Sequence, residues 1–70
     1  MHKLVVARLI KGYNQQQFAD AVGISKMYLY KIEKKQQIPS RKVMSKIATV
    51  LGKKIEQIEK MFKASARKGE

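Results

Sequence analysis

Apolar residues recur at intervals of three and four along almost the whole chain, a spacing typical of amphipathic α-helices. No segment shows the strict alternation of apolar and polar residues that marks a half-buried strand. Glycine, serine and asparagine interrupt the helical pattern, and these residue types favour helix ends. The pattern therefore predicts an all-α protein, a compact bundle of five helices.

The first two helices are separated by a short polar segment. One apolar side of the first helix is expected to consist of Leu4, Val5, Leu9 and Ile10. Gly12 ends this helix, because glycine readily adopts the left-handed conformation found at helix C-termini. Asn14 then stands at an N-cap position with Gln17 three residues later, as in a capping box. The second helix is therefore predicted over residues 15–22.

The third helix follows after a very short turn. Gly23 ends the second helix and Ser25 is a favourable N-cap, so the third helix is predicted over residues 26–34. So short a turn with a glycine at its start holds two helices at a steep angle, which is the geometry of a helix-turn-helix. Leu29 and Ile32 share one side of the third helix and form its predicted buried stripe.

Two further helices complete the predicted domain. Ser40 caps a helix over residues 41–51, which Gly52 ends, and a last helix runs over residues 55–63. The segment 64–70 is small, polar and charged, and is expected to fray. The predicted organisation is one helix-turn-helix domain over residues 1–63 with a flexible basic tail over residues 64–70.

The charge of the chain points to a polyanionic partner. Sixteen Lys and Arg residues against five Asp and Glu residues give a net charge of +11. Residues 25–63 hold eleven basic and three acidic side chains, a net charge of +8, so the positive charge is concentrated on the later helices. A merely solvated lysine-rich surface is the alternative interpretation.

Several classes of function fit the sequence poorly. The chain has no cysteine and a single histidine, His2, for which we expect no role, so neither a metal site nor a cofactor is expected. Glu56 and Glu59 lie one turn apart among lysines and are interpreted as surface charges rather than a catalytic dyad. We therefore predict a protein that is not an enzyme. Because no apolar stretch is long enough to cross a bilayer, we expect a cytoplasmic protein that does not bind membranes.

The side of the third helix opposite its buried stripe combines charge with apolar surface. It presents Lys26, Met27, Tyr30 and Lys31, an unusual set for core packing but a suitable one for contacting bases in the major groove. There lysine can donate to guanine and an apolar tip can meet a thymine methyl group. Tyr28 lies at the flank, where it either reaches the DNA or packs at the edge of the domain.

These segments resemble the lambda-repressor-like domain of the Cro/C1 type, also called the XRE family, from Lys3 to Phe62. The matching stretches are Arg8, Asn14-Gln15-x-x-Phe18-Ala19, Gly23-Ile24-Ser25, Tyr28-Leu29-x-Lys31-Ile32-Glu33, Pro39-Ser40, Lys46-Ile47-Ala48 and Leu51-Gly52. The resemblance implies a helix-turn-helix formed by the second and third helices. One departure is Lys35, which stands where the family usually has glycine, so the loop either accepts a left-handed lysine or takes another path.

The resemblance and the predicted helix ends assign candidate site residues. The candidates for base contact are Lys26, Met27, Lys31, Tyr28 and Tyr30. The candidates for DNA backbone contact are Asn14, Gln15, Ser25, Lys34, Lys35, Ser40, Arg41 and Lys42, and the resemblance implies that Gln15 also braces the recognition helix. It further implies an ion pair between Arg8 and Glu33 that is structural in role.

The expected function is that of a sequence-specific regulator of transcription, a repressor, which binds double-stranded DNA as a homodimer on a palindromic operator. Met61 and Phe62 are the candidate dimer residues, and closure of the domain's own core is the alternative for both. A competing hypothesis is an antitoxin-like or co-regulator module that chiefly binds another protein.

Overall fold

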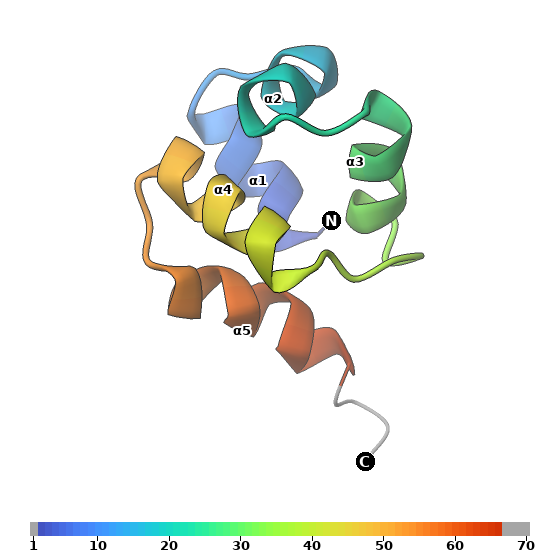
Figure 1. The fold of residues 1–70 in the computed structure, drawn as a ribbon, viewed down its shortest axis with the longest axis vertical. Helices are drawn as coiled ribbons and strands as arrows, with labels where there is room; N and C mark the ends of the chain where they lie inside the picture. Colours follow the sequence, from blue (N-terminus) through green and yellow to red (C-terminus); the bar gives the residue numbers. More distant parts are fainter. Residues whose placement is uncertain (1, 67–70) are drawn as a thin grey trace.

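The computed structural model describes residues 2–66, with side chains over residues 2–62. The described chain folds into five α-helices without a strand: α1 (Lys3–Ile10), α2 (Gln15–Val22), α3 (Lys26–Glu33), α4 (Arg41–Leu51) and α5 (Ile55–Ala66) (Figure 1). The predicted all-α class and the predicted bounds of the second and fourth helices are confirmed. α3 ends one residue before the predicted limit.

The N-termini of three helices are held by the side chains that the sequence indicated. The Asn14 side chain accepts a hydrogen bond from the Gln17 amide at 2.7 Å, and the Gln17 side chain accepts one from the Asn14 amide at 2.9 Å. The hydroxyls of Ser25 and Ser40 each accept from the amide three residues later, at 3.0 and 3.2 Å. Each bond satisfies an amide that has no partner within its helix, so local chemistry sets where these helices begin.

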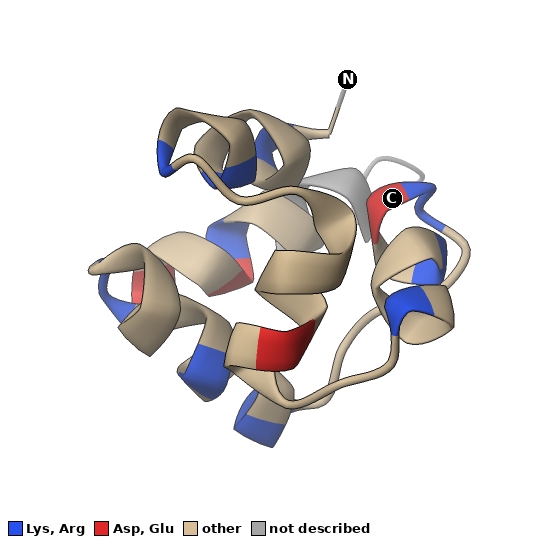
Figure 2. Ribbon diagram, turned by 90° about the horizontal axis from the view of Figure 1, so that it is seen from above, with Lys and Arg blue, Asp and Glu red and all other residues tan. Residues whose placement is uncertain are grey.

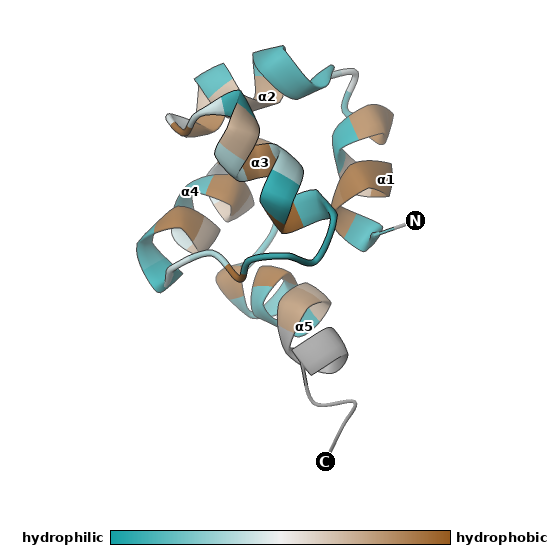
Figure 3. Ribbon diagram, turned by 90° about the vertical axis from the view of Figure 1, so that its right-hand side faces the viewer, coloured by the Kyte–Doolittle hydropathy of each residue, from teal (hydrophilic) through white to brown (hydrophobic). Residues whose placement is uncertain are grey.

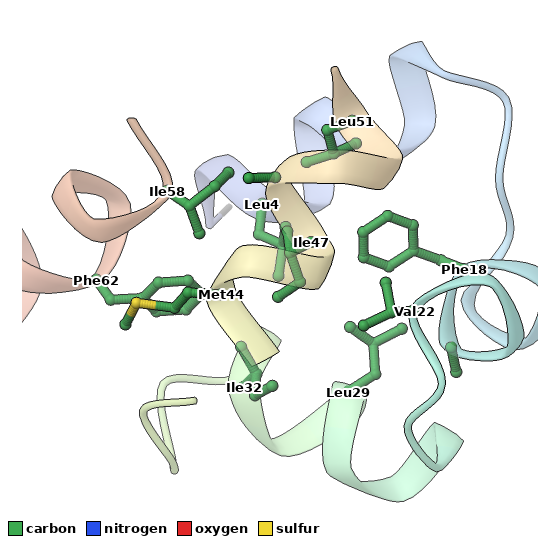
Figure 4. Close-up of a cluster of buried hydrophobic side chains, with 12 residues drawn as sticks. Leu4, Phe18, Val22, Leu29, Ile32, Met44, Ile47, Leu51, Ile58 and Phe62 are labelled. Atoms are coloured by element: carbon green, nitrogen blue, oxygen red, sulfur yellow. The ribbon is translucent and has the colours of Figure 1, made fainter. Parts of the chain in front are cut away.

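A single apolar core lies between the helices (Figure 4). α4 packs against both α2 and α5, and α2 packs against α3. The six largest fully buried side chains are Phe18, Leu4, Leu29, Ile32, Ile47 and Ile58. Because α3 contributes Leu29 and Ile32 to this core, its opposite side is left facing outward.

The inward side of α1 differs from the predicted one. Leu4 is fully buried as expected, but Leu9 and Ile10 are 54% and 79% exposed, and the buried position one turn after Leu4 is Arg8. Leu9 and Ile10 lie about 120–140° around the helix from Leu4, so they turn outward when Arg8 turns inward. The prediction that Leu9 and Ile10 belong to the inward side of α1 was therefore wrong.

α5 also differs from the prediction, because it continues to Ala66, three residues beyond the expected end. The intervening sequence Ala-Ser-Ala contains no glycine or proline, and alanine has the highest intrinsic helix propensity. The first part of the predicted flexible tail is thus helical, and residues 67–70 lie outside the described residues. Among the residues that the structure describes, no helix is long and apolar enough to span a membrane.

The C-termini of α1 to α4 share one backbone geometry. At Gly12, Gly23, Lys35 and Gly52 the chain turns left-handed, with φ values of 86°, 87°, 63° and 70°. After α3, the Lys35 amide donates to Ile32 and the Gln36 amide donates to Lys31, at 3.1 and 2.8 Å, which is the Schellman pattern. Of the two paths open to it, Lys35 therefore takes the left-handed one.

Replacing Lys35 by glycine is expected to stabilise the fold by about 1 kcal/mol, because the left-handed conformation is strained for a residue with a Cβ. Urea unfolding followed by circular dichroism measures the change. Gly52→Ala is the matched control. A Cβ at Gly52 would meet no atom closer than 3.9 Å, so its expected loss of about 1 kcal/mol arises from backbone strain alone. Equal stability of Lys35→Gly and the parent chain would contradict this account.

His2, for which no role was expected, is a structural residue. Its Nδ1 accepts a hydrogen bond from the Leu4 amide at 3.0 Å and thereby caps α1. Its ring also packs on Phe62 with the ring centroids 4.9 Å apart, and the residue is 7% exposed. A histidine directly before a helical pattern could have been interpreted as a cap. The contact between His2 and Phe62, 60 residues away, could not have been predicted from the local sequence.

The stability of the fold is expected to decrease below about pH 6.5 through His2. Burial of the imidazole, followed by the nearby charge of Lys35, lowers the pKa of His2 below 6.5, although the charge of Glu33 opposes this shift. The unfolded chain then binds the proton more readily than the folded one, so the contribution of His2 is complete above pH 6.5 and is lost as the pH falls through the folded pKa. Urea unfolding between pH 7.5 and 5 measures this loss.

The variant His2→Asn keeps an N-cap side chain but cannot titrate, so it serves as the control. Its stability should vary less over the same range of pH. Identical pH profiles for the parent chain and this variant would show that His2 does not carry the effect.

Candidate nucleic-acid interface

α3 is divided into a buried side and an exposed side. Leu29 and Ile32 are fully buried, whereas Met27 and Tyr30 are 63% and 44% exposed. Lys26 and Lys31 are exposed as well. In Figure 3 the helix lies on the side of the globule that faces the viewer. The structure thus places the predicted outward residues of α3 in solvent.

Part of this exposed side forms a shallow hollow shared with α2. Gln15, Lys26, Met27 and Tyr30 line it together. An adjoining hollow is also lined by Gln15 and Tyr30, and adds Lys34, whose Nζ lies 5.7 Å from the centre of the Tyr30 ring. We call this surface the recognition face and define it as Gln15, Lys26, Met27, Tyr30, Lys31 and Lys34. It combines three lysines with apolar surface at one end of the helix-turn-helix.

A buried ionic network holds the recognition face in place. The Arg8 guanidinium donates from Nε to Glu33 at 2.8 Å and from Nη1 to the carbonyl of Tyr13 at 3.0 Å. The Gln15 side chain donates to the same carboxylate at 2.9 Å. The side chains of Arg8 and Glu33 are only 8% and 5% exposed. The ion pair implied by the resemblance is therefore present and joins α1 to α3, and the Gln15 hydrogen bond adds α2 to the network.

Gln15 has hydrogen-bonding capacity beyond this network. A side-chain amide has two N–H donors and a carbonyl acceptor, and the network uses one donor. Gln15 can therefore brace α3 through Glu33 and still donate to a phosphate. The two roles implied for this residue are chemically compatible.

Tyr28 differs from its neighbours on α3 because it is half-buried and packs against the core. The sequence left two possibilities for Tyr28, contact with DNA or packing at the edge of the domain, and this position corresponds to the second. Since it is not fully buried, the residue remains at the margin of the recognition face.

The candidates for DNA backbone contact lie at helix ends. Asn14, Ser25 and Ser40 are the N-caps of α2, α3 and α4. Lys35 is exposed at the left-handed turn after α3, and Lys42 is exposed in the first turn of α4. These residues surround the ends of the helices rather than the middle, as expected for groups that would reach the phosphates beside a groove.

Arg41 is the exception among these candidates. It forms an ion pair with Glu59 of α5, a contact that the sequence pattern does not predict. The Arg41 side chain is 72% exposed, so water screens the pair strongly. The two residues are 18 positions apart and share no local pattern, so the contact follows only from the packing of α4 on α5.

Basic residues occur on several helices, and acidic residues are few among them (Figure 2). A helix-turn-helix family model, HTH_3, matches residues 6–58. The chain belongs to the Cro/C1-type helix-turn-helix family. No curated protein and no solved structure matches it significantly.

Membership of this family defines the class of the protein. Cro/C1-type helix-turn-helix domains are DNA-binding domains of transcription regulators and are not typically enzymes. The matched segment contains all of α2, α3 and α4, and therefore the whole recognition face. The protein is a DNA-binding member of this group, and the exposed side of α3 is its candidate reading surface.

Proposed function

We propose that this protein is a sequence-specific repressor of transcription that places α3 in the major groove of double-stranded DNA. The supporting observation is the combination of an exposed, basic and apolar face on α3 with a buried network that fixes the helix from behind. A rigid helix can align side chains with base edges at little cost in conformational entropy. Repression requires only that the bound protein occupy its site.

Base contacts are assigned to the N-terminal and central part of α3. Residues near the N-terminus of a recognition helix approach the base edges most closely, which favours Lys26 and Met27. Lys31, one turn further along, is the second candidate for donating to guanine. Tyr30 is assigned to the edge of this contact, and Tyr28 to its flank.

Backbone contacts are assigned to the helix ends around this face. The amides at the N-termini of α2 and α4 can bind phosphate, beside the capping residues Asn14 and Ser40. Lys34, Lys35 and Lys42 add positive charge next to these ends. Together they would hold α3 in register without reading the sequence.

We further propose that two subunits bind a palindromic operator. A single recognition helix reads only a few base pairs, so useful affinity calls for two half-sites about one helical turn apart. Phe62 is 3% exposed and belongs to the core of its own domain, which is the alternative that the sequence left open for it. Met61 is half-buried and remains the candidate for contact between subunits.

Selection of bound duplexes from a random pool tests this function directly. The expected result is a palindromic motif. A lone half-site would show that the protein binds as a monomer, and the absence of enrichment would overturn sequence-specific recognition. In vitro transcription from a promoter that overlaps the selected motif then distinguishes repression from activation.

The affinity for the selected duplex is expected to fall steeply with salt. Neutralising about four phosphates gives a slope of log K against log salt of about −3 to −4 per subunit. Lys42→Ala should reduce the magnitude of this slope by about 1, whereas Lys53→Ala should leave it unchanged, because Lys53 is not among the assigned phosphate contacts. A binding curve insensitive to salt would contradict the assigned phosphate contacts.

A further inference from the structure

α1 carries an exposed apolar surface that serves neither the core nor the recognition face. Of the six large apolar side chains that are exposed in the described chain, Val6, Leu9 and Ile10 belong to α1. Val6 and Ile10 are one turn apart on the same side of the helix, so they form a short stripe. Exposed apolar side chains that adjoin one another in this way are candidates for an interaction site.

This stripe forms one wall of a groove between α1 and α5. Met61 of α5 lies in the opposite wall, and Leu51 at the end of α4 contributes to the lining. We call this surface the α1–α5 groove. The hollow measures about 330 Å³, but Ile10 is 79% exposed, so it is an open groove rather than an enclosed pocket for a small molecule. None of its lining residues belongs to the recognition face. DNA bound at the recognition face would therefore leave the groove accessible.

The rim of the groove is positively charged. Lys3, Lys11 and Lys53 all line it, and its lining contains no carboxylate. The two ion pairs found among residues 2–62 are Arg8 with Glu33 and Arg41 with Glu59, so neither involves these three lysines. An apolar floor with a basic rim is complementary to a ligand that is apolar in the middle and acidic at its edges.

We propose that the α1–α5 groove binds an acidic amphipathic helix of another protein. An amphipathic helix lies in an apolar groove by inserting side chains spaced three or four residues apart. Lys3 and Lys11 are separated by eight residues of helix, roughly 12 Å, so a matching partner carries acidic residues about two turns apart on either side of its apolar anchors.

A second copy of this chain fits the groove less well. A symmetric contact would bring three lysines from each copy to one interface, and like charges close together are unfavourable. The acidic residues of α5 do not relieve this repulsion, because Glu56 and Glu59 lie about 140–160° around the helix from Met61. Glu59 is in addition paired with Arg41. Charge complementarity therefore favours a different, acidic partner in the groove, so this proposal and a dimer contact through Met61 exclude each other.

Selection from a displayed library of random 16-residue peptides tests this proposal, with the full chain as target and excess duplex DNA present to occupy the recognition face. The expected peptides carry apolar residues three or four apart and acidic residues seven or eight apart. Ile10→Ser should weaken their binding at least tenfold, and Leu9→Ser, a change at another exposed apolar residue of α1 that lies outside the groove lining, should not. The double variant Lys3→Glu with Lys53→Glu should weaken it similarly, and peptides with lysine in place of the acids should bind this variant better than the parent chain.

Three results would overturn the proposal. One is the absence of enriched peptides, or enrichment of basic or uncharged ones. Another is peptide binding that is lost in Lys26→Ala and Lys31→Ala but retained in Ile10→Ser, which would place the peptide on the recognition face. The third is a dimer in sedimentation equilibrium that Ile10→Ser converts to a monomer, because the groove would then be an interface between copies of this chain. The first two results do not bear on DNA binding, which the duplex selection tests separately. The third would support the proposed dimer and assign the groove to it.

Discussion

Replacing Arg8 by alanine is expected to lower the free energy of unfolding by about 3–5 kcal/mol. The guanidinium provides the charge that balances Glu33, and both side chains are almost completely buried. Without Arg8, Glu33 keeps only the hydrogen bond from Gln15 and becomes an uncompensated buried charge. Because a domain of this size has a total stability of roughly 3–5 kcal/mol, the variant should be largely unfolded in circular dichroism at 25 °C.

Companion variants separate loss of charge balance from loss of packing. The double variant Arg8→Met with Glu33→Leu removes both charges and should lose less stability than Arg8→Ala, because no ion is left unpaired. Arg41→Ala breaks the exposed pair with Glu59 and should cost at most about 1 kcal/mol in urea unfolding. Equal losses for Arg8→Ala and Arg41→Ala would show that burial of the first pair does not determine its energetic importance.

Replacing Lys31 by alanine is expected to weaken binding to the selected duplex by about 1–3 kcal/mol, or roughly 5–150-fold. Lys31 is exposed on α3, so its removal should leave the fold unchanged. The loss should be concentrated at one base pair of the motif, because a base contact discriminates while a phosphate contact does not. Fluorescence anisotropy with the selected duplex and its single-base variants measures both quantities.

Lys60→Ala is the matched control for Lys31→Ala, since Lys60 is an exposed lysine of α5 outside the recognition face. It should change the affinity little. If Lys31→Ala weakened all duplexes by the same factor, Lys31 would be a phosphate contact. Lys26 would then carry the reading of guanine, and Lys26→Ala measured in the same way would decide between the two residues.

The buried network also connects the stability of the fold with the presentation of the candidate site. Glu33 receives donors from α1 and from α2 while it belongs to α3 itself. If a phosphate draws the Gln15 amide away, Glu33 still retains the charged partner Arg8. A helix held in this way from two sides keeps its outward side chains aligned, which is the property that reading a base sequence requires.

The sequence by itself determined where the helices begin and which side of α3 is buried. Asn14, Ser25 and Ser40 mark helix starts because their side chains satisfy amides only a few residues away. The buried stripe of α3 follows in the same way from the helical repeat. These features are local, so one window of sequence contains all the groups that produce them.

Only the tertiary structure decided which side of α1 faces inward and that His2, at the start of the described chain, packs on Phe62 of α5. The apolar pattern of α1 favoured Leu9 and Ile10 as core residues. The Arg8 side chain lies inward instead, because Glu33, 25 residues away, provides its charged partner. His2 and Phe62 become mutual neighbours only when α5 packs beside the start of α1. A hydrophobic pattern shows which side chains are apolar. Which of them become buried depends on partners that are distant along the chain. As a consequence Val6, Leu9 and Ile10 are left exposed on α1, and Val6 and Ile10 line the α1–α5 groove.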